Sequence, residues 1–271
     1  MTYCCGILVC EGLVMIADTR TNAGLDNIST FRKLHVYAQP GERIFALASA
    51  GNLSFVQSIV SILGEGVQNP ETGEPETLMN APTMFQAAQL IGRAIHKIHK
   101  VEAGTLESDE VKFDVSFLFG GQILHGPMRL FMIYGAGNFI ECTVDTPFLQ
   151  IGEHKYGKPV LDRAVTYETE LNDALKLALI SMDSTLKSNL GVGMPIDMMV
   201  ACRDACDTEL NTRIELGDEY FHDLRERWSK ALRAAHAAIP APPYIAQRKG
   251  GQAKVRLVEP AHLTDDAPQK R

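Results

Sequence analysis

The sequence predicts an α+β protein in which helices cover sheets, and three observations support this prediction. Short apolar stretches typical of strands come in pairs near the amino terminus, and each pair is joined by a turn that contains glycine. Longer segments in which apolar residues recur every three or four positions, as in helices, follow the strands in two blocks. Because strands and helices come in blocks, the order favours packed layers of sheets and helices.

The first strand pair is expected at residues 3–9 and 13–17, with a turn at Glu11-Gly12, since glycine adopts the positive φ that a tight turn needs. Asp18 then ends the second strand, where a side chain is exposed but well positioned. Residues 19–30 are polar and contain asparagine and glycine, so they are expected to form a loop.

The second strand pair is expected at residues 34–38 and 43–49, with Pro40 and Gly41 favouring the turn between them. The remaining expected elements are, in order, helices at 53–63 and 83–100, strands at 114–120, 130–134 and 139–144, helices at 159–166 and 171–188, strands at 196–201 and 212–215, and a helix at 219–237.

The chain is expected to hold one large domain and a tail. No linker rich in Pro, Gly or Ser divides residues 2–237, so we expect a single domain there. Residues 238–271 begin with several prolines, include basic residues and contain few large apolar ones. Such a segment cannot bury enough surface to order itself, so we expect an extended or disordered carboxy-terminal extension.

The composition excludes several classes of protein. With 45% hydrophobic residues and 22% charged residues the chain can bury a sizeable core, and its net charge of −7 gives no reason to expect nucleic acid or an anionic membrane as a partner. Residues 1–17 lack the basic start of a signal peptide and no apolar run is long enough to cross a membrane, so we expect a cytoplasmic protein. The six cysteines are scattered and are expected to be reduced thiols rather than disulfides or metal ligands.

Thr2 is the candidate nucleophile. Removal of Met1 would leave a threonine whose hydroxyl and free α-amine belong to one residue, so the nucleophile would carry its own base. The strand expected at residues 3–9 would hold this terminus rigidly. Thr2 could attack a peptide or amide carbonyl and form an acyl-enzyme ester, which water then hydrolyses.

Further motifs match a known family. They are the Thr2 start, Ala17-Asp18-Thr19-Arg20, Phe31-Arg32-Lys33-Leu34, Ala48-Ser49-Ala50-Gly51, the segment from Gln150 to Pro159, and the segment from Leu177 to Ser188. In combination they resemble proteasome β-type subunits, most closely the bacterial proteasome-like Anbu family, from about Thr2 to Trp228. The resemblance implies the four-layer αββα sandwich of N-terminal nucleophile hydrolases, which the residue pattern alone does not indicate.

The resemblance also assigns roles around Thr2. The Lys33 ammonium would favour the deprotonated hydroxyl of Thr2, and Asp18 would hold that ammonium in place. Because a charge in a cleft serves chemistry, we expect Lys33 to contribute little to packing. The backbone N–H of Gly51, at the end of a strand, would stabilise the oxyanion.

Substrate contacts follow from the same resemblance. Thr21, Asn22 and the stretch around Ser49 would form edges that pin an extended substrate by main-chain hydrogen bonds.

Supporting residues near the Thr2 amine are assigned by the same comparison. Asp183 and either Ser184 or Ser188 resemble the Asp and Ser that hydrogen-bond that amine. In the segment Gly152-Glu153-His154, His154 occupies the expected position of a further supporting serine.

The resemblance implies a threonine-type N-terminal nucleophile peptidase or amidohydrolase that uses neither metal nor organic cofactor. It would act on peptide or amide bonds as a ring or open spiral of identical subunits. Two alternatives stay open: a small-molecule amidase with the same nucleophile, and a noncatalytic structural subunit. The sequence indicates neither the substrate, nor the number of subunits, nor any ATPase partner.

Overall fold

The computed structural model describes residues 1–22, 28–69, 72–109 and 113–242, with the backbone alone at residues 22, 28 and 103–109. The chain divides into two compact units, Met1–Lys230 and Ala231–Arg271. The expected division at residues 237 and 238 stays a prediction, because residues 243–271 lie outside the described part.

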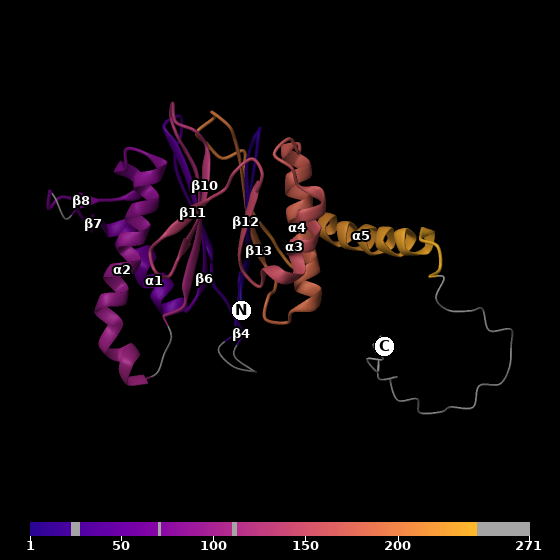
Figure 1. Cartoon of the computed structure of the whole chain (residues 1–271), viewed down its shortest axis with the longest axis horizontal. Helices are drawn as coiled ribbons and strands as arrows, with labels where there is room; N and C mark the ends of the chain where they lie inside the picture. The colour runs from indigo at the N-terminus through magenta and orange to yellow at the C-terminus, as the bar shows by residue number, and fades with distance from the viewer. Residues whose placement is uncertain (23–27, 70–71, 110–112, 243–271) are drawn as a thin grey trace, which may run out of the picture. The chain divides into compact units, whose positions relative to one another are not determined.

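Two five-stranded antiparallel sheets form the centre of the first unit (Figure 1). The first sheet has the order β12 (Phe148–Gly152), β1 (Tyr3–Val9), β2 (Gly12–Asp18), β13 (Ile196–Cys202) and β14 (Leu210–Ile214). The second sheet has the order β11 (Phe139–Glu141), β10 (Arg129–Tyr134), β9 (Val115–Ile123), β6 (Arg43–Gly51) and β5 (Leu34–Gln39). Both expected hairpins are present, with Val9 opposite Gly12 and Gln39 opposite Arg43.

Helices cover the outer face of each sheet, as Figure 1 shows. Helices α1 (Leu53–Glu65) and α2 (Met84–Asp109) lie on the second sheet, whereas α3 (His154–Ala164) and α4 (Leu171–Ser188) lie on the first. The order is therefore helices, sheet, sheet, helices, which is the αββα sandwich that the resemblance implied. This part of the fold prediction is confirmed.

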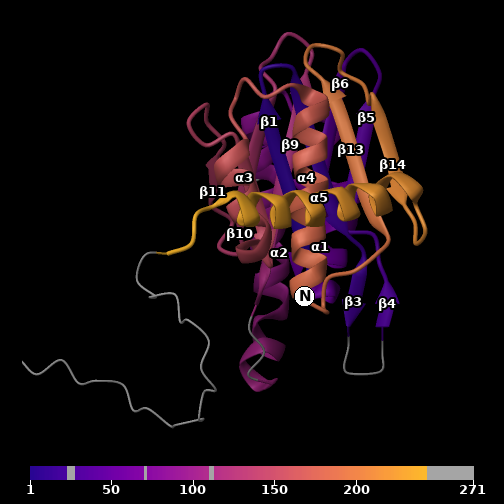
Figure 2. The same cartoon turned by 90° about the vertical axis from the view of Figure 1, so that its right-hand side faces the viewer.

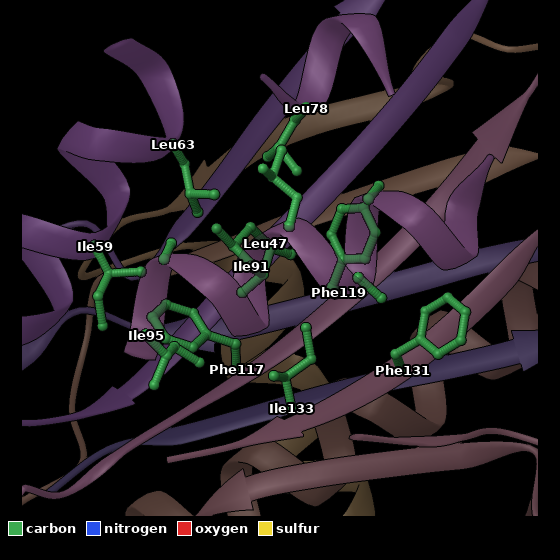
Figure 3. Packing of buried hydrophobic residues seen from close by; sticks show 14 of the residues in the cluster. Leu47, Ile59, Leu63, Leu78, Ile91, Ile95, Phe117, Phe119, Phe131 and Ile133 are labelled. Carbon is green, nitrogen blue, oxygen red and sulfur yellow. The ribbon is translucent and has the colours of Figure 1, made fainter. Parts of the chain in front are cut away.

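Three apolar clusters fill the three spaces between the layers. The cluster under α1 and α2 joins Ile59 and Ile95 to the aromatic residues Phe117, Phe119 and Phe131 of the second sheet (Figure 3). A second cluster, which includes Tyr3, lies between the first sheet and its helices. The third lies between the two sheets. Burial of apolar area at roughly 25 cal/mol per Å² in each space stabilises the four layers together.

The segment expected to be a loop at residues 19–30 contains two short strands, β3 (Arg20–Asn22) and β4 (Ile28–Thr30), which pair with each other. Figure 2 shows them projecting together at the end of the sandwich where the amino terminus lies. The polar residues of these strands do not show the apolar alternation typical of a strand, because the strands belong to neither large sheet. They nevertheless place Thr21 beside the amino terminus.

Helix α3 begins at His154, although the sequence favoured a start at Pro159. The additional turn contains Gly157, where a Cβ would lie 2.3 Å from Ser181 Oγ in α4. The glycine therefore permits close helix packing, and that packing outweighs its poor helix propensity.

The last helix, α5 (Glu219–Ala238), continues from the first unit into the second. Its Phe221 and Leu224 are buried in the cluster on the outer face of the first sheet. Two further paired segments, β7 (Val67–Gln68) and β8 (Pro75–Glu76), precede a short 3-10 helix at Leu78–Asn80. Within the part of the chain that the structure describes, no helix is both long enough and apolar enough to cross a bilayer.

Candidate active site

Thr2 lies directly before β1, next to the end of β12. The pairing of Tyr3 with Gly152 fixes its position, and Glu153 N–H donates to the Thr2 carbonyl at 2.7 Å. Thr2 is only 7% exposed, yet it lines a cleft of about 350 Å³. Among the residues that the structure describes, none makes a hydrogen bond to the Thr2 hydroxyl. The backbone of Thr2 is thus fixed by the sheet, and its hydroxyl is free to meet a ligand.

Asp18 and Lys33 form a buried ion pair beside Thr2. Lys33 Nζ donates to Asp18 Oδ1 at 2.8 Å, and the two side chains are 6% and 0% exposed. Burial raises the pKa of the Asp18 carboxyl, and the charge of Lys33 opposes that rise. Asp18 also accepts hydrogen bonds from Tyr3 N–H at 3.0 Å and Gly193 N–H at 3.1 Å. Because all three partners donate hydrogens, the arrangement favours the ionised carboxylate.

Two carbonyls complete the contacts of the Lys33 ammonium. It donates to Arg20 O at 2.6 Å and makes a longer contact of 3.4 Å with Met1 O. The expectation that Lys33 contributes little to packing is therefore wrong. An ammonium buried against a carboxylate and two carbonyls is a structural element as well as a charge.

The end of β6 forms one wall of the cleft. Gly51 has φ of +117°, and a Cβ there would lie 2.1 Å from Asp114 O, so only glycine fits. Gly51 and Thr2 line the same cleft, and the role of Gly51 as oxyanion donor stays a prediction. Asn52, which follows, caps α1 by accepting a hydrogen bond from Ser54 N–H at 3.0 Å.

The predicted substrate-binding residues are partly brought together. Thr21 and Ser49 both line the cleft. Ser49 donates its N–H to Lys33 O at 3.0 Å and its hydroxyl to the same oxygen at 3.3 Å, so it fixes the segment that carries Lys33. Asn22 ends β3, and its side chain lies outside the described part. Main-chain pairing of a substrate with these residues stays a prediction.

Asp183 and Ser188 do not line this cleft. The carboxylate of Asp183, in α4, accepts a hydrogen bond from Arg225 Nε of α5 at 2.6 Å. Ser188 is exposed at the end of α4, and Ser184 donates to Ile180 O within that helix. The structure therefore gives Asp183 and Ser184 other partners than Thr2, and their predicted roles lack support from its geometry.

His154 lies at a different cavity, of about 680 Å³, between β12 and α3. Its Nδ1 is 3.1 Å from Gly152 O, and its side chain is exposed. The residue of this segment that forms a hydrogen bond with Thr2 is Glu153, whose backbone N–H donates to the Thr2 carbonyl. His154 therefore does not take the position of a serine beside Thr2.

Two residues of the site escaped the sequence reasoning. Gly193 donates its N–H to Asp18, and a Cβ on it would lie 2.1 Å from Arg20 Nε. Arg20 in turn donates to Leu190 O at 3.1 Å, while its Nε is buried without a partner among the described residues. The two glycines at Gly191 and Gly193 were the available signal, since paired glycines after a helix mark close approach of backbone.

Neither thiols nor metal ligands gather at this cleft in the described part of the chain. Cys4 is buried next to the site, where its Sγ contacts Ser49 O at 3.6 Å. Burial raises the pKa of Cys4 and raises that of Cys5 to about 12, which disfavours a thiolate at either position. Across the described residues, no three His, Cys, Asp or Glu side chains group closely enough to hold a metal ion.

Comparison with protein-family profiles finds no match, and comparison with curated protein sequences finds none either. Solved structures match over most of the chain. A Gly-1 mutant of Anbu from Hyphomicrobium sp. strain MC1 is 48% identical with a TM-score of 0.81, and the match covers 89% of this chain and 99% of that one.

Two further Anbu structures are similar to the same extent. Anbu from Yersinia bercovieri is 45% identical with a TM-score of 0.81, covering 89% of this chain and 99% of that one. Anbu from Pseudomonas aeruginosa, solved as a helical assembly, is 41% identical with a TM-score of 0.82, covering 89% and 98%. The αββα fold, the residues gathered around Thr2 and these likenesses agree, and the chain belongs to Anbu, the bacterial proteasome-like family.

Proposed function

We propose that this protein is a threonine-type N-terminal nucleophile hydrolase that cleaves peptide or amide bonds through an acyl-enzyme on Thr2. One observation carries the proposal. Thr2, a buried residue whose hydroxyl has no hydrogen-bond partner among the described residues, lines a cleft beside a buried Lys33–Asp18 pair. A threonine that served packing alone would gain nothing from a neighbouring ion pair, in which Lys33 Nζ and Asp18 Oδ1 lie 2.8 Å apart.

The proposed reaction begins after Met1 is removed. Met1 is 66% exposed, so a peptidase can reach it. Its departure frees the Thr2 amine and removes the carbonyl that Lys33 Nζ contacts at 3.4 Å. One ammonium hydrogen of Lys33 is then available next to the new amine, where it favours the neutral, basic form of that amine.

The Thr2 hydroxyl then attacks the substrate carbonyl, and the amine accepts the hydroxyl proton. The new carbon–oxygen bond turns the carbonyl oxygen into the oxyanion of a tetrahedral intermediate. When this intermediate collapses, the carbon–nitrogen bond breaks and the leaving amine takes the proton from the Thr2 ammonium. Gly51 N–H stabilises the oxyanion, a contribution of about 10²–10³ in rate for one such donor. Water next attacks the ester, which releases the acid and restores the Thr2 hydroxyl.

A set of Thr2 variants tests this proposal. Thr2→Ala should abolish hydrolysis of amide substrates, whereas Thr2→Ser should retain part of it because the hydroxyl and the amine remain. Circular dichroism of both variants should match the parent protein, since a small side chain at the start of β1 carries little packing. Unchanged hydrolysis by Thr2→Ala would exclude the proposed nucleophile and leave the alternative of a noncatalytic structural subunit.

The substrate can be a peptide or a small amide. The cleft of about 350 Å³ is at the small end of ligand sites, which suits a short acyl group in either kind of molecule. Turnover of unfolded casein compared with that of short amides separates a peptidase from the alternative, a small-molecule amidase with the same nucleophile.

Self-assembly is the second part of the proposal. The Pseudomonas aeruginosa relative forms a helical assembly. The first unit of this chain exposes large apolar side chains that a partner could cover, namely Val144, Leu190, Leu216 and Tyr220. Repeated identical contacts give a closed ring or an open spiral according to the rotation at each interface. Sedimentation should therefore show a particle far larger than 29.8 kDa, and a stable, fully active monomer would contradict the assembly.

A further inference from the structure

The charge of the cleft beside Thr2 has a definite sign. The whole chain carries a net charge of −7, yet none of the described residues that line this cleft is Asp or Glu. The charge of Lys33 is balanced by that of Asp18, whose Oδ1 lies 2.8 Å from Lys33 Nζ. The sign is therefore set by Arg32, the other charged side chain in the lining, and by the amino group of the chain terminus, which is also positive when protonated.

The Arg32 guanidinium is free to meet an anion. Its side chain is 64% exposed, and its nearest carboxylate, Asp197, is 4.0 Å away. Both oxygens of Asp197 already accept hydrogen bonds from Arg213, at 2.6 Å and 2.9 Å. Arg32 is therefore left without a hydrogen-bonded carboxylate among the described residues. His35 adds none, because burial first and then the charge of Arg32 lower the pKa of its imidazole.

The opposite wall favours the same sign of ligand. Helix α1 begins at this wall with Leu53, and its first turn carries no acidic residue. The amino end of a helix stabilises a nearby negative charge. A second, independent feature points to a ligand here, since Thr2 is 7% exposed, lines the cleft, and has a hydroxyl without a hydrogen-bond partner among the described residues.

The size of the cleft limits where the charge of a ligand can lie. About 350 Å³ accommodates little more than one substrate side chain beside the scissile bond. Ala50, Leu53 and Val56 offer an apolar wall for the stem of that side chain. A side chain with a short apolar stem and a charged end fits these surfaces.

We infer that the cleft selects substrates with a carboxylate on the residue that Thr2 acylates, such as a glutamyl residue, and that Arg32 sets this preference. The inference rests on the proposed function for its turnover arm, but the binding arm below does not need catalysis. Arg32 acts through its charge at the rim, separate from the Thr2, Asp18 and Lys33 machinery.

The first experiment compares two substrates that differ in charge alone. The parent protein is supplied with acetyl-Ala-Ala-Glu and acetyl-Ala-Ala-Gln aminomethylcoumarin amides, and kcat/KM is measured for each. We expect the glutamyl substrate to exceed the glutaminyl one about two- to fivefold, the range for an exposed ion pair. Arg32→Gln should bring the ratio to about one, and Arg32→Glu should reverse it.

The matched control is Arg227→Gln. Arg227 lies on α5, is 79% exposed and pairs with Asp223, so its loss changes the net charge equally but away from the cleft. The ratio should stay at the parent value in this variant. Equal kcat/KM for the two substrates in the parent protein, or a ratio that Arg32→Gln leaves unchanged, overturns the inference.

A binding arm separates this inference from the proposed chemistry. Fluorescent glutamyl and glutaminyl peptides are titrated against Thr2→Ala and against Thr2→Ala with Arg32→Gln, with anisotropy as the readout. Tighter binding of the glutamyl peptide that disappears with Arg32→Gln supports the charge preference even if no variant hydrolyses any amide. Equal binding of the two peptides overturns it even if Thr2 proves to be the nucleophile.

Discussion

Replacement of Lys33 by alanine should cost both activity and stability, which makes it the most informative substitution in this protein. The change removes the charge beside Thr2 and leaves the Asp18 carboxylate, which is 0% exposed, without its cation. Removing one partner of a buried ion pair costs about 3–5 kcal/mol. For a unit of this size that loss lowers the melting temperature by about 6–20 °C.

A double variant separates the two effects. Asp18→Asn combined with Lys33→Met removes both charges and should recover part of the lost stability. The recovery is partial because Tyr3 N–H and Gly193 N–H donate to different oxygens of Asp18, and asparagine keeps an acceptor for one of them alone. It should stay inactive, because the ammonium beside Thr2 is still absent. The assays are thermal unfolding and initial hydrolysis rate per folded molecule. A Lys33→Ala protein that melts at the parent temperature and hydrolyses at the parent rate would refute the reasoning.

Three further predictions follow from the same geometry. Gly193→Ala should lower stability in urea unfolding by about 1–3 kcal/mol and should reduce activity, because its Cβ would lie 2.1 Å from Arg20 Nε. Gly64→Ala is the control: its Cβ meets nothing within 4 Å, so stability and activity should both stay at the parent values. Activity should rise from acid to mildly alkaline pH as the Thr2 amine, with an ordinary pKa of about 7.7–8.0, loses its proton and becomes a base, so a pH–rate profile with an optimum near 4 would contradict it. Iodoacetamide at neutral pH should alkylate neither Cys4 nor Cys5 and should leave hydrolysis unchanged, since burial raises the pKa of both thiols. Peptide mapping that finds Cys4 modified together with loss of activity would indicate a thiol nucleophile in place of Thr2.

The strands and helices with strong periodicity could be predicted from the sequence. The strand at 3–9 and the helix at 171–188 have the predicted bounds, because their apolar positions match the faces they bury. The strands β3 and β4 could not be predicted, since polar residues pair there without a core to enforce a pattern. The predicted start of α3 was wrong because close contact with α4 requires a glycine at position 157, and local helix propensity does not report such a contact.

The candidate site was predictable in its centre and less so at its margin. The resemblance named Thr2, Asp18, Lys33 and Gly51, and all four lie on or next to strand ends. Strand ends are well defined by the sheets, so the structure places Thr2, Lys33 and Gly51 at one cleft and Asp18 against Lys33. Asp183 lies within the long helix α4 and Gly193 follows it, so their distances from Thr2 depend on tertiary packing. The burial of Lys33 also depends on packing, and for that reason the expectation from the sequence underestimated the contribution of Lys33 to stability.

The measurement that tests the central claim most directly is the intact mass of the protein after treatment with a β-lactone that acylates N-terminal threonines. The account predicts a chain that begins at Thr2 and carries one adduct, located on Thr2 by peptide mapping, with no adduct in Lys33→Ala. Active protein that retains Met1, or a single adduct on any residue other than Thr2, would contradict it.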